Sequence, residues 1–325
     1  MPRHKLASLS AFMALMLATS AAHAAPQPAD YVRASGTNLV VGSEDRRIFL
    51  RGVGFGNDVW SNSPLPTTTD HSEADFRLLR ENNFNAVRFY LNYSFFEDDA
   101  RPSVYKKSGF DWLDQNIAWA EKNDIYLILS MEIAQGGAQA GTDLWDNADS
   151  RSRLAALWKE IAAHCRDKTR VAAYDLLNGP QTSTSIGQWQ DLAAELVRTV
   201  RTVDPLHLIF IQRAAGIRNQ WASYGTVNLF LVKDSNVAYA FQFYDPIEYT
   251  NQYAPWMDMR KGVEGGVYPD ESSVSAPVDS IWAGFSDNSP PSRPARRNGR
   301  SSTETSVSST RSGIPDSASA GPYSR

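Results

Sequence analysis

Residues 171–180 read VAAYDLLNGP, an apolar run that is closed by Asn178, Gly179 and Pro180. A continuous apolar run bounded by turn residues is typical of a strand that is buried on both faces of a sheet. The pattern therefore predicts a buried strand over 171–177. The turn that follows places small and polar residues at the carboxyl end of that strand.

Similar strands alternate with amphipathic helical stretches along the chain. Continuous apolar strands separated by such helices predict a parallel sheet covered on both faces. About six strands within roughly 240 residues, with polar residues at their carboxyl ends, favour a (β/α)8 TIM barrel. A doubly wound sheet is the alternative, which the lack of a glycine-rich loop after the first strand disfavours. Besides 171–177, strands are predicted over 46–55, 84–91, 125–133, 206–212 and 237–244, and helices over 72–83, 111–123, 151–167 and 186–203.

The first 24 residues have the pattern of a secretory signal peptide. Basic residues precede an apolar stretch that is too short to span a membrane comfortably, and Ala22, His23 and Ala24 form an A-x-A cleavage site. We therefore expect a mature chain that begins near Ala25 and is secreted or periplasmic. No later stretch is long and apolar enough to span a membrane, so no membrane contact is expected after cleavage.

Composition disfavours several other classes of function. The formal net charge of -4 gives no indication of nucleic-acid binding. The histidines after the predicted cleavage site, His71, His164 and His207, lack metal-ligand spacing. The single cysteine, Cys165, lies in a helical stretch and can form no internal disulfide. We expect neither a metal nor a cofactor, and we expect a monomer.

Seven motifs fall together in one order: FLRGVGFGN, NFNAVRFYLNY, YLILSMEIAQGG, LWDN, VAAYDLLNGPQ, DPLHLIFIQ and YAFQFYDPIEYTNQ. In order and spacing they resemble glycoside hydrolase family 5, the retaining cellulase and mannanase family, over residues 38–260. The resemblance implies a TIM barrel that hydrolyses O-glycosyl bonds, with a β-linked polysaccharide or oligosaccharide of the cellulose class as its partner. It does not distinguish glucan from mannan or xylan.

Retaining hydrolysis needs two carboxylates about 5 Å apart, one as the nucleophile and the other as the acid/base. In the family, the acid/base glutamate follows the asparagine of an Asn-Glu-Pro motif, which matches Asn178, Gly179 and Pro180 here. Asn178 can still hold a sugar 2-hydroxyl. Gly179 has no side chain and can neither donate nor accept a proton, so the resemblance implies that the acid/base carboxylate is lost.

The other family positions are partly kept. Arg88 and Tyr244 match the arginine and tyrosine that orient the reacting groups, whereas Glu132 and Gln242 stand where the family usually has histidine. Glu132 could serve as a replacement proton donor, or it could be a polar rim residue that fills the space of an imidazole. Substrate contacts are expected from aromatic residues in or after strand-end loops, with core packing as the alternative for each: Trp60, Tyr90, Trp145 and Trp256.

No residue matches the nucleophile expected after the seventh strand. Residues 289–325 are dominated by Ser, Arg, Pro, Gly and Thr and contain no Leu, Phe or Trp, which predicts disorder. A barrel over residues 25–288 would then be incomplete, with strands seven and eight missing or out of frame. The abrupt change in composition favours a frameshift over a natural Ser/Arg-rich tail.

Three functions stay open at this point. The chain is an impaired or inactive glycosidase, a non-catalytic glycan-binding pseudoenzyme, or the product of a decaying gene with no function. The loss at Gly179 and the missing nucleophile favour a protein without competent hydrolysis.

Overall fold

The computed structural model of the chain describes residues 25–61, 65, 70–138, 141–218, 220–221, 229–244 and 250–251. The predicted signal peptide and the predicted disordered tail lie outside these residues. The same holds for the region in which strands seven and eight were expected.

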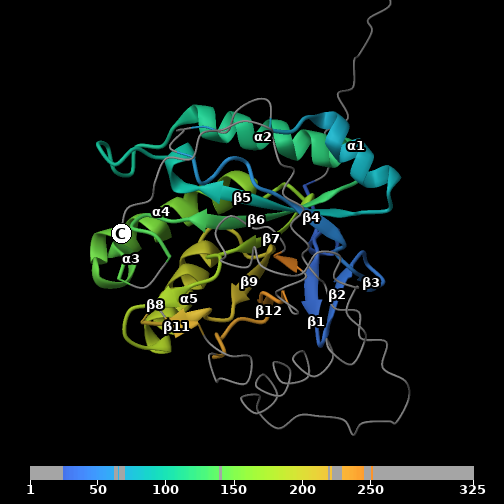
Figure 1. The fold of residues 1–325 in the computed structure, drawn as a ribbon. Coiled ribbons are helices and arrows are strands. Elements are labelled where there is room, and N and C mark those ends of the chain that lie inside the picture. The colour runs from blue at the N-terminus through green and yellow to red at the C-terminus, as the bar shows by residue number, and fades with distance from the viewer. Residues whose placement is uncertain are drawn as a thin grey trace, which may run out of the picture.

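Six parallel strands form one sheet in the order in which they occur along the chain (Figure 1). Each strand pairs in parallel with the next, so every new strand is added on the same side of the last. A doubly wound sheet reverses its strand order part-way, whereas a barrel does not. The order confirms the barrel-type α/β fold and excludes the doubly wound alternative. The strands are β4 (Gly52–Phe55), β5 (Ala86–Asn92), β6 (Tyr126–Ile133), β7 (Val171–Asp175), β9 (Leu208–Gln212) and β12 (Val237–Ala240).

Four long helices connect the first five of these strands and confirm the predicted alternation. Helix α1 begins after Ser72, whose backbone N–H donates to the Asp75 carboxylate at 2.7 Å, and the Ser72 side chain accepts in return from the third helical N–H. This capping box satisfies two backbone donors that the helix itself cannot pair. The helices are α1 (Glu73–Glu81), α2 (Lys107–Lys122), α4 (Ala148–Cys165) and α5 (Ile186–Arg201), and the short α3 (Asp143–Asp146) precedes α4.

The main hydrophobic core lies between the sheet and these helices. Trp158 on α4 and Trp189 on α5 are fully buried in it, and Trp112 and Trp119 on α2 pack against it, so these helical tryptophans are packing residues. Cys165 is buried as well, and burial raises the pKa of its thiol. A thiol held in this neutral form is a poor nucleophile.

Two small sheets accompany the large one. The sheet β1 (Arg33–Ser35), β2 (Asn38–Val41) and β3 (Arg46–Ile48) is antiparallel and comes before β4. Its apolar side chains form a second cluster with residues of β7 and β9, so the N-terminal segment packs against the strands of the barrel. The other small sheet joins β8 (Gln181–Thr182), β10 (Gly216–Ile217) and β11 (Gln220–Trp221).

A buried polar cluster fixes the connection between α5 and β9. Asp204 accepts hydrogen bonds from the Tyr174 hydroxyl at 2.7 Å and contacts Nδ1 of His207 at 2.6 Å. Burial alone would raise the pKa of Asp204, but the hydrogen bonds and charge of His207 outweigh it and lower this pKa to about 2. The cluster joins β7 to the turn before β9 and is structural, because Asp204 and His207 are inaccessible to solvent.

Candidate active site

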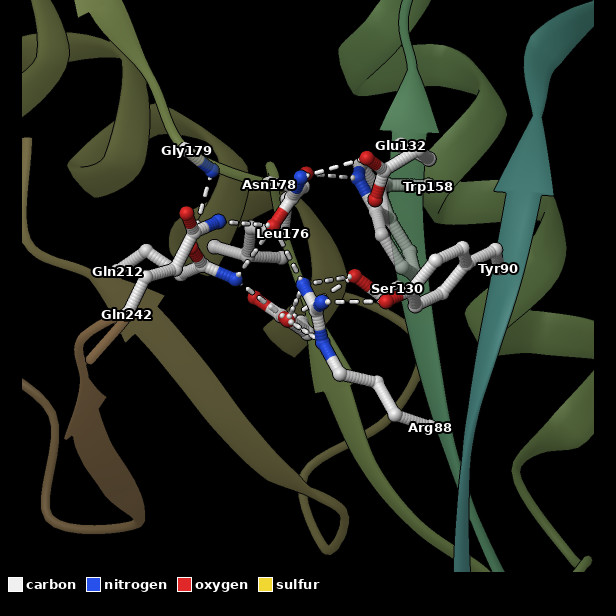
Figure 2. Close-up of polar contacts among 11 residues, drawn as sticks. Arg88, Tyr90, Ser130, Glu132, Trp158, Leu176, Asn178, Gly179, Gln212 and Gln242 are labelled. Atoms are coloured by element: carbon white, nitrogen blue, oxygen red, sulfur yellow. Dashed lines mark hydrogen bonds and ion pairs between the residues drawn. The ribbon is translucent and has the colours of Figure 1, made fainter. Parts of the chain in front are cut away.

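Polar side chains from neighbouring strands converge on one small region of the sheet (Figure 2). Arg88 comes from β5, Glu132 from β6, and Asn178 and Gly179 from the segment directly after β7. Gln242 comes from the segment after β12. The carboxyl ends of parallel strands meet at the same edge of a barrel, so residues far apart in sequence come together there. The structure thus brings together these five residues that the sequence singled out.

An ion pair lies beneath this cluster. The Arg88 guanidinium donates to Asp175 Oδ2 from Nη2 at 2.8 Å and from Nε at 3.1 Å, and its Nη2 also donates to Ser130 Oγ at 2.7 Å. The Asp175 side chain is only 2% exposed and accepts further hydrogen bonds from Ser130 Oγ at 3.0 Å and Gln212 Nε2 at 2.7 Å. Although burial alone would lower the pKa of Arg88, the Asp175 carboxylate raises it. Arg88 is therefore a fixed cation.

Asn178 is held in one orientation by its neighbours. Its Oδ1 accepts hydrogen bonds from Arg88 Nη2 and Gln242 Nε2, both at 2.7 Å. Two donors on one atom identify that atom as the amide oxygen. The Nδ2 group must then face Glu132, to whose Oε1 it donates at 2.6 Å.

Gly179 occupies the position at which the resemblance places the acid/base glutamate. Its φ of +49° lies in the left-handed region, which glycine adopts without the steric cost of a Cβ. The Gly179 N–H donates to Gln212 Oε1 at 2.9 Å. A Cβ added here would lie 3.2 Å from Gln242 Nε2, so a larger side chain would have to displace that amide. No titratable group is present at this position, and Gln242 borders the space that such a group would use.

Glu132 is the one carboxyl group of this cluster that has no cation in direct contact among the described residues. Burial raises its pKa to about 7 and the Asp175 charge adds to this effect, whereas Arg88 and the hydrogen bond from Asn178 oppose it. Its Oε2 atom has no hydrogen-bond partner in the described part of the chain. At neutral pH the side chain can therefore carry a proton, which an ordinary glutamate does not.

Two of the predicted aromatic contacts lie beside each other. Trp60 is 61% exposed, and its ring meets that of Tyr90 edge to face with the centroids 5.9 Å apart. The Tyr90 hydroxyl is 3.4 Å from Nη1 of Arg88, and burial raises the pKa of Tyr90 to about 12. Trp60 therefore presents an accessible indole next to a residue of the polar cluster.

The other predicted aromatic residues differ in their surroundings. Trp145 lies on α3, is 3% exposed and directs its indole N–H to the Ala138 carbonyl, so its position favours packing over sugar stacking. Tyr244 is partly buried near the cluster, and burial raises its pKa. Trp256 lies outside the described residues.

Three residues of the cluster were not singled out from the sequence: Ser130, Asp175 and Gln212. The sequence does contain an indication for Asp175, because an acidic residue inside a fully buried strand requires a partner. The indication for Gln212 is weaker: it is the polar residue at the end of an apolar strand. The sequence contains no indication for Ser130, because serine within an apolar strand is common in protein cores.

The barrel order and this strand-end cluster agree with the comparisons. The model of the family described as Cellulase (glycosyl hydrolase family 5) matches residues 44–290. The chain belongs to glycosyl hydrolase family 5. The earlier resemblance is thereby confirmed.

Relatives of the chain include a xylosidase and an endoglucanase. A β-xylosidase from Phanerodontia chrysosporium is 30% identical over 223 residues, which cover 56% of this chain and 46% of the relative. Endoglucanase C from Acetivibrio thermocellus is 26% identical over 218 residues, which cover 65% of this chain and 62% of the relative. The chain thus spans about half to three fifths of the length of these two relatives.

Solved structures support the fold. The endoglucanase Cel5A from Thermotoga maritima superimposes with a TM-score of 0.61 at 23% sequence identity, covering 73% of this chain and 75% of that chain. Another structure of Cel5A from this organism is a complex with a mannotriose substrate. At this level of identity the likeness shows the TIM-barrel fold alone.

Two further observations on the described residues concern membrane spans and metal sites. None of their helices is long and apolar enough to cross a membrane. They also contain no group of three or more His, Cys, Asp or Glu side chains that could hold a metal ion. The site expected for the nucleophile lies outside this part of the chain.

Proposed function

We propose that this family 5 protein binds β-linked glucan oligosaccharides at the carboxyl-end cluster and hydrolyses them weakly or not at all. The observation that carries the proposal is that Gly179 stands in place of a carboxylate. Beside it, hydrogen bonds hold the side chains of Arg88 and Asn178 in fixed orientations in which they can bind a sugar. Arg88 and the Nδ2 group of Asn178 offer N–H donors for sugar hydroxyls. The exposed Trp60 offers an apolar face for the C–H surface of a sugar ring.

The expected loss of hydrolysis follows from the chemistry. A positioned general acid or base contributes about 10²–10⁴-fold to such a reaction. In a retaining mechanism the same carboxyl group protonates the leaving oxygen and then activates water, so its removal affects both steps. A glycine cannot do either, and Asp175 is held by its ion pair with Arg88.

Glucan is the proposed substrate class because several relatives, among them endoglucanases C and H, are endoglucanases. The β-xylosidase relative and the mannotriose complex make xylan and mannan the alternatives to be compared.

We also propose that the protein is exported to the periplasm or beyond, on the basis of the N-terminal sequence pattern.

A slow hydrolase with Glu132 as proton donor is the second candidate function. It is favoured by the free Oε2 atom of Glu132 and by a pKa of about 7, both suited to an acid at neutral pH. Glu132 nevertheless lies on β6 rather than after β7, so it approaches the site from another strand. Product analysis distinguishes the two functions.

Isothermal titration calorimetry with cellotetraose, xylotetraose and mannotetraose tests the binding function. We expect saturable binding with a dissociation constant in the range of about 10 µM to 1 mM and a preference for cellotetraose. Trp60→Ala should weaken the affinity about tenfold through loss of the stacking face, equivalent to about 1.4 kcal/mol. Leu78→Ala removes an exposed apolar side chain on α1 and serves as the matched control. No heat of binding with any of the three sugars would contradict the proposal.

A further inference from the structure

Glu132 occupies a position that favours a neutral side chain. One of its oxygens accepts the Asn178 hydrogen bond at 2.6 Å, and the fixed orientation of that amide makes this bond obligatory. The other oxygen, Oε2, is buried and has no hydrogen-bond partner in the described part of the chain. A buried carboxylate oxygen without a donor is costly, whereas a protonated carboxyl group carries no charge to desolvate.

The charged and titratable groups that face Glu132 do not compensate for a negative charge. Arg88 and Tyr90 face it from β5, Asp175 from β7, and Tyr244 from the segment after β12. The guanidinium of Arg88 is already paired with Asp175 at 2.8 Å. An ionised Glu132 would therefore place a second carboxylate beside a single cation.

A bound oligosaccharide would strengthen this preference. It is uncharged, and by covering the rim it removes the water that would otherwise solvate a carboxylate. A protonated carboxyl group, in contrast, has an O–H that can donate to a sugar oxygen once Oε2 moves out to the rim, while its other oxygen keeps accepting from Asn178. The sugar thus supplies the acceptor that Oε2 lacks.

We propose that Glu132 contacts the sugar as a neutral carboxylic acid, so that oligosaccharide binding is coupled to the uptake of one proton. The inference rests on the proposed function, because it concerns the same ligand and the same cluster. It assigns to Glu132 a donor role in affinity that an ionised glutamate at this position would not have.

The sign of the pH dependence follows from linkage. If the sugar raises the pKa of Glu132 above its value of about 7 in the free protein, the complex binds more protons than the free protein does. Affinity is then highest below the free-state pKa and falls as the pH rises through it. The limiting slope is about tenfold in affinity per pH unit.

Calorimetric titration of the full chain with cellotetraose from about pH 5.5 to about pH 8.5 tests the proposal. For the wild type we expect affinity to fall about tenfold across this range. Titrations near neutral pH in two buffers with different ionisation heats should show proton uptake on binding. Glu132→Gln mimics the neutral acid and should bind with the low-pH affinity of the wild type at every pH. Glu81→Gln, an exposed carboxylate on α1, should keep the pH dependence of the wild type.

Three results would overturn the inference and leave the proposed function standing. They are wild-type binding with constant affinity over the range, affinity that rises with pH, and a pH dependence that persists in Glu132→Gln. Absence of binding at every pH would contradict the proposed function, on which the inference rests. Circular dichroism of each variant over the same pH range separates these results from unfolding.

Discussion

Replacing Arg88 by methionine is expected to lower the free energy of unfolding by about 3–5 kcal/mol and to abolish oligosaccharide binding. The loss of stability arises at Asp175, whose side chain is almost completely buried. Without the guanidinium, Asp175 keeps only the neutral donors Ser130 and Gln212 among the residues that the structure describes. The loss of binding arises at Asn178, whose oxygen loses the donor that fixes it.

Urea unfolding of Arg88→Met and of the double variant Arg88→Met/Asp175→Asn separates the two causes. The double variant removes the uncompensated carboxylate, so it should be more stable than Arg88→Met by about 1–3 kcal/mol. Its oligosaccharide affinity should stay lost, because Arg88 is still absent. If Arg88→Met unfolds at the same urea concentration as the wild type, the ion pair does not support the site as described.

Trp158→Ala is expected to destabilise the protein by about 3–5 kcal/mol, the usual cost of truncating a fully buried tryptophan. Trp158 lies on α4 with no exposed surface, and its indole N–H donates to the Leu176 carbonyl at 2.9 Å. Leu176 belongs to the segment that leads from β7 to Asn178 (Figure 2). The indole therefore supports the backbone that presents the site.

Trp158→Phe distinguishes packing from hydrogen bonding. It keeps an aromatic ring but leaves the Leu176 carbonyl without this donor, which should cost about 1–3 kcal/mol. Thermal and urea unfolding measure both variants, and Trp119→Phe on α2 provides a matched indole-to-phenyl control. Equal effects of Trp158→Phe and Trp119→Phe would show that the hydrogen bond to Leu176 contributes nothing.

The sequence predicted the large elements because their patterns are strong. Residues 125–133 and 171–177 are apolar enough to be recognised as buried strands, and the helices between them have clear periodicity. The boundaries were less accurate: β7 ends at Asp175 and β12 at Ala240, earlier than predicted. Strand ends depend on pairing with a neighbour, which local sequence does not encode. The short strands β1 and β2 were missed for the same reason, and residues 46–55, predicted as one strand, form the two strands β3 and β4.

The candidate site was predictable where it rests on the family motifs. Arg88, Asn178 and Gly179 were found in this way, and Gln242 and Glu132 were found as departures from the motif. The ion pair of Arg88 with Asp175 could not be predicted from the sequence, because the two residues are 87 positions apart along the chain. The sequence also could not separate the exposed Trp60 from the buried Trp145, since both follow strand ends in the sequence.

A time course of proton NMR spectra on cellopentaose mixed with the full chain tests the central claim most directly. One sample reports both properties: saturation transferred from protein to sugar shows binding, and new reducing-end anomeric signals show hydrolysis. We expect clear saturation transfer and little or no growth of anomeric signals beyond a protein-free control. Rapid release of shorter oligosaccharides, at a rate that doubles with protein concentration, would contradict the proposal, because the site would then hydrolyse glucan efficiently without a carboxylate at position 179.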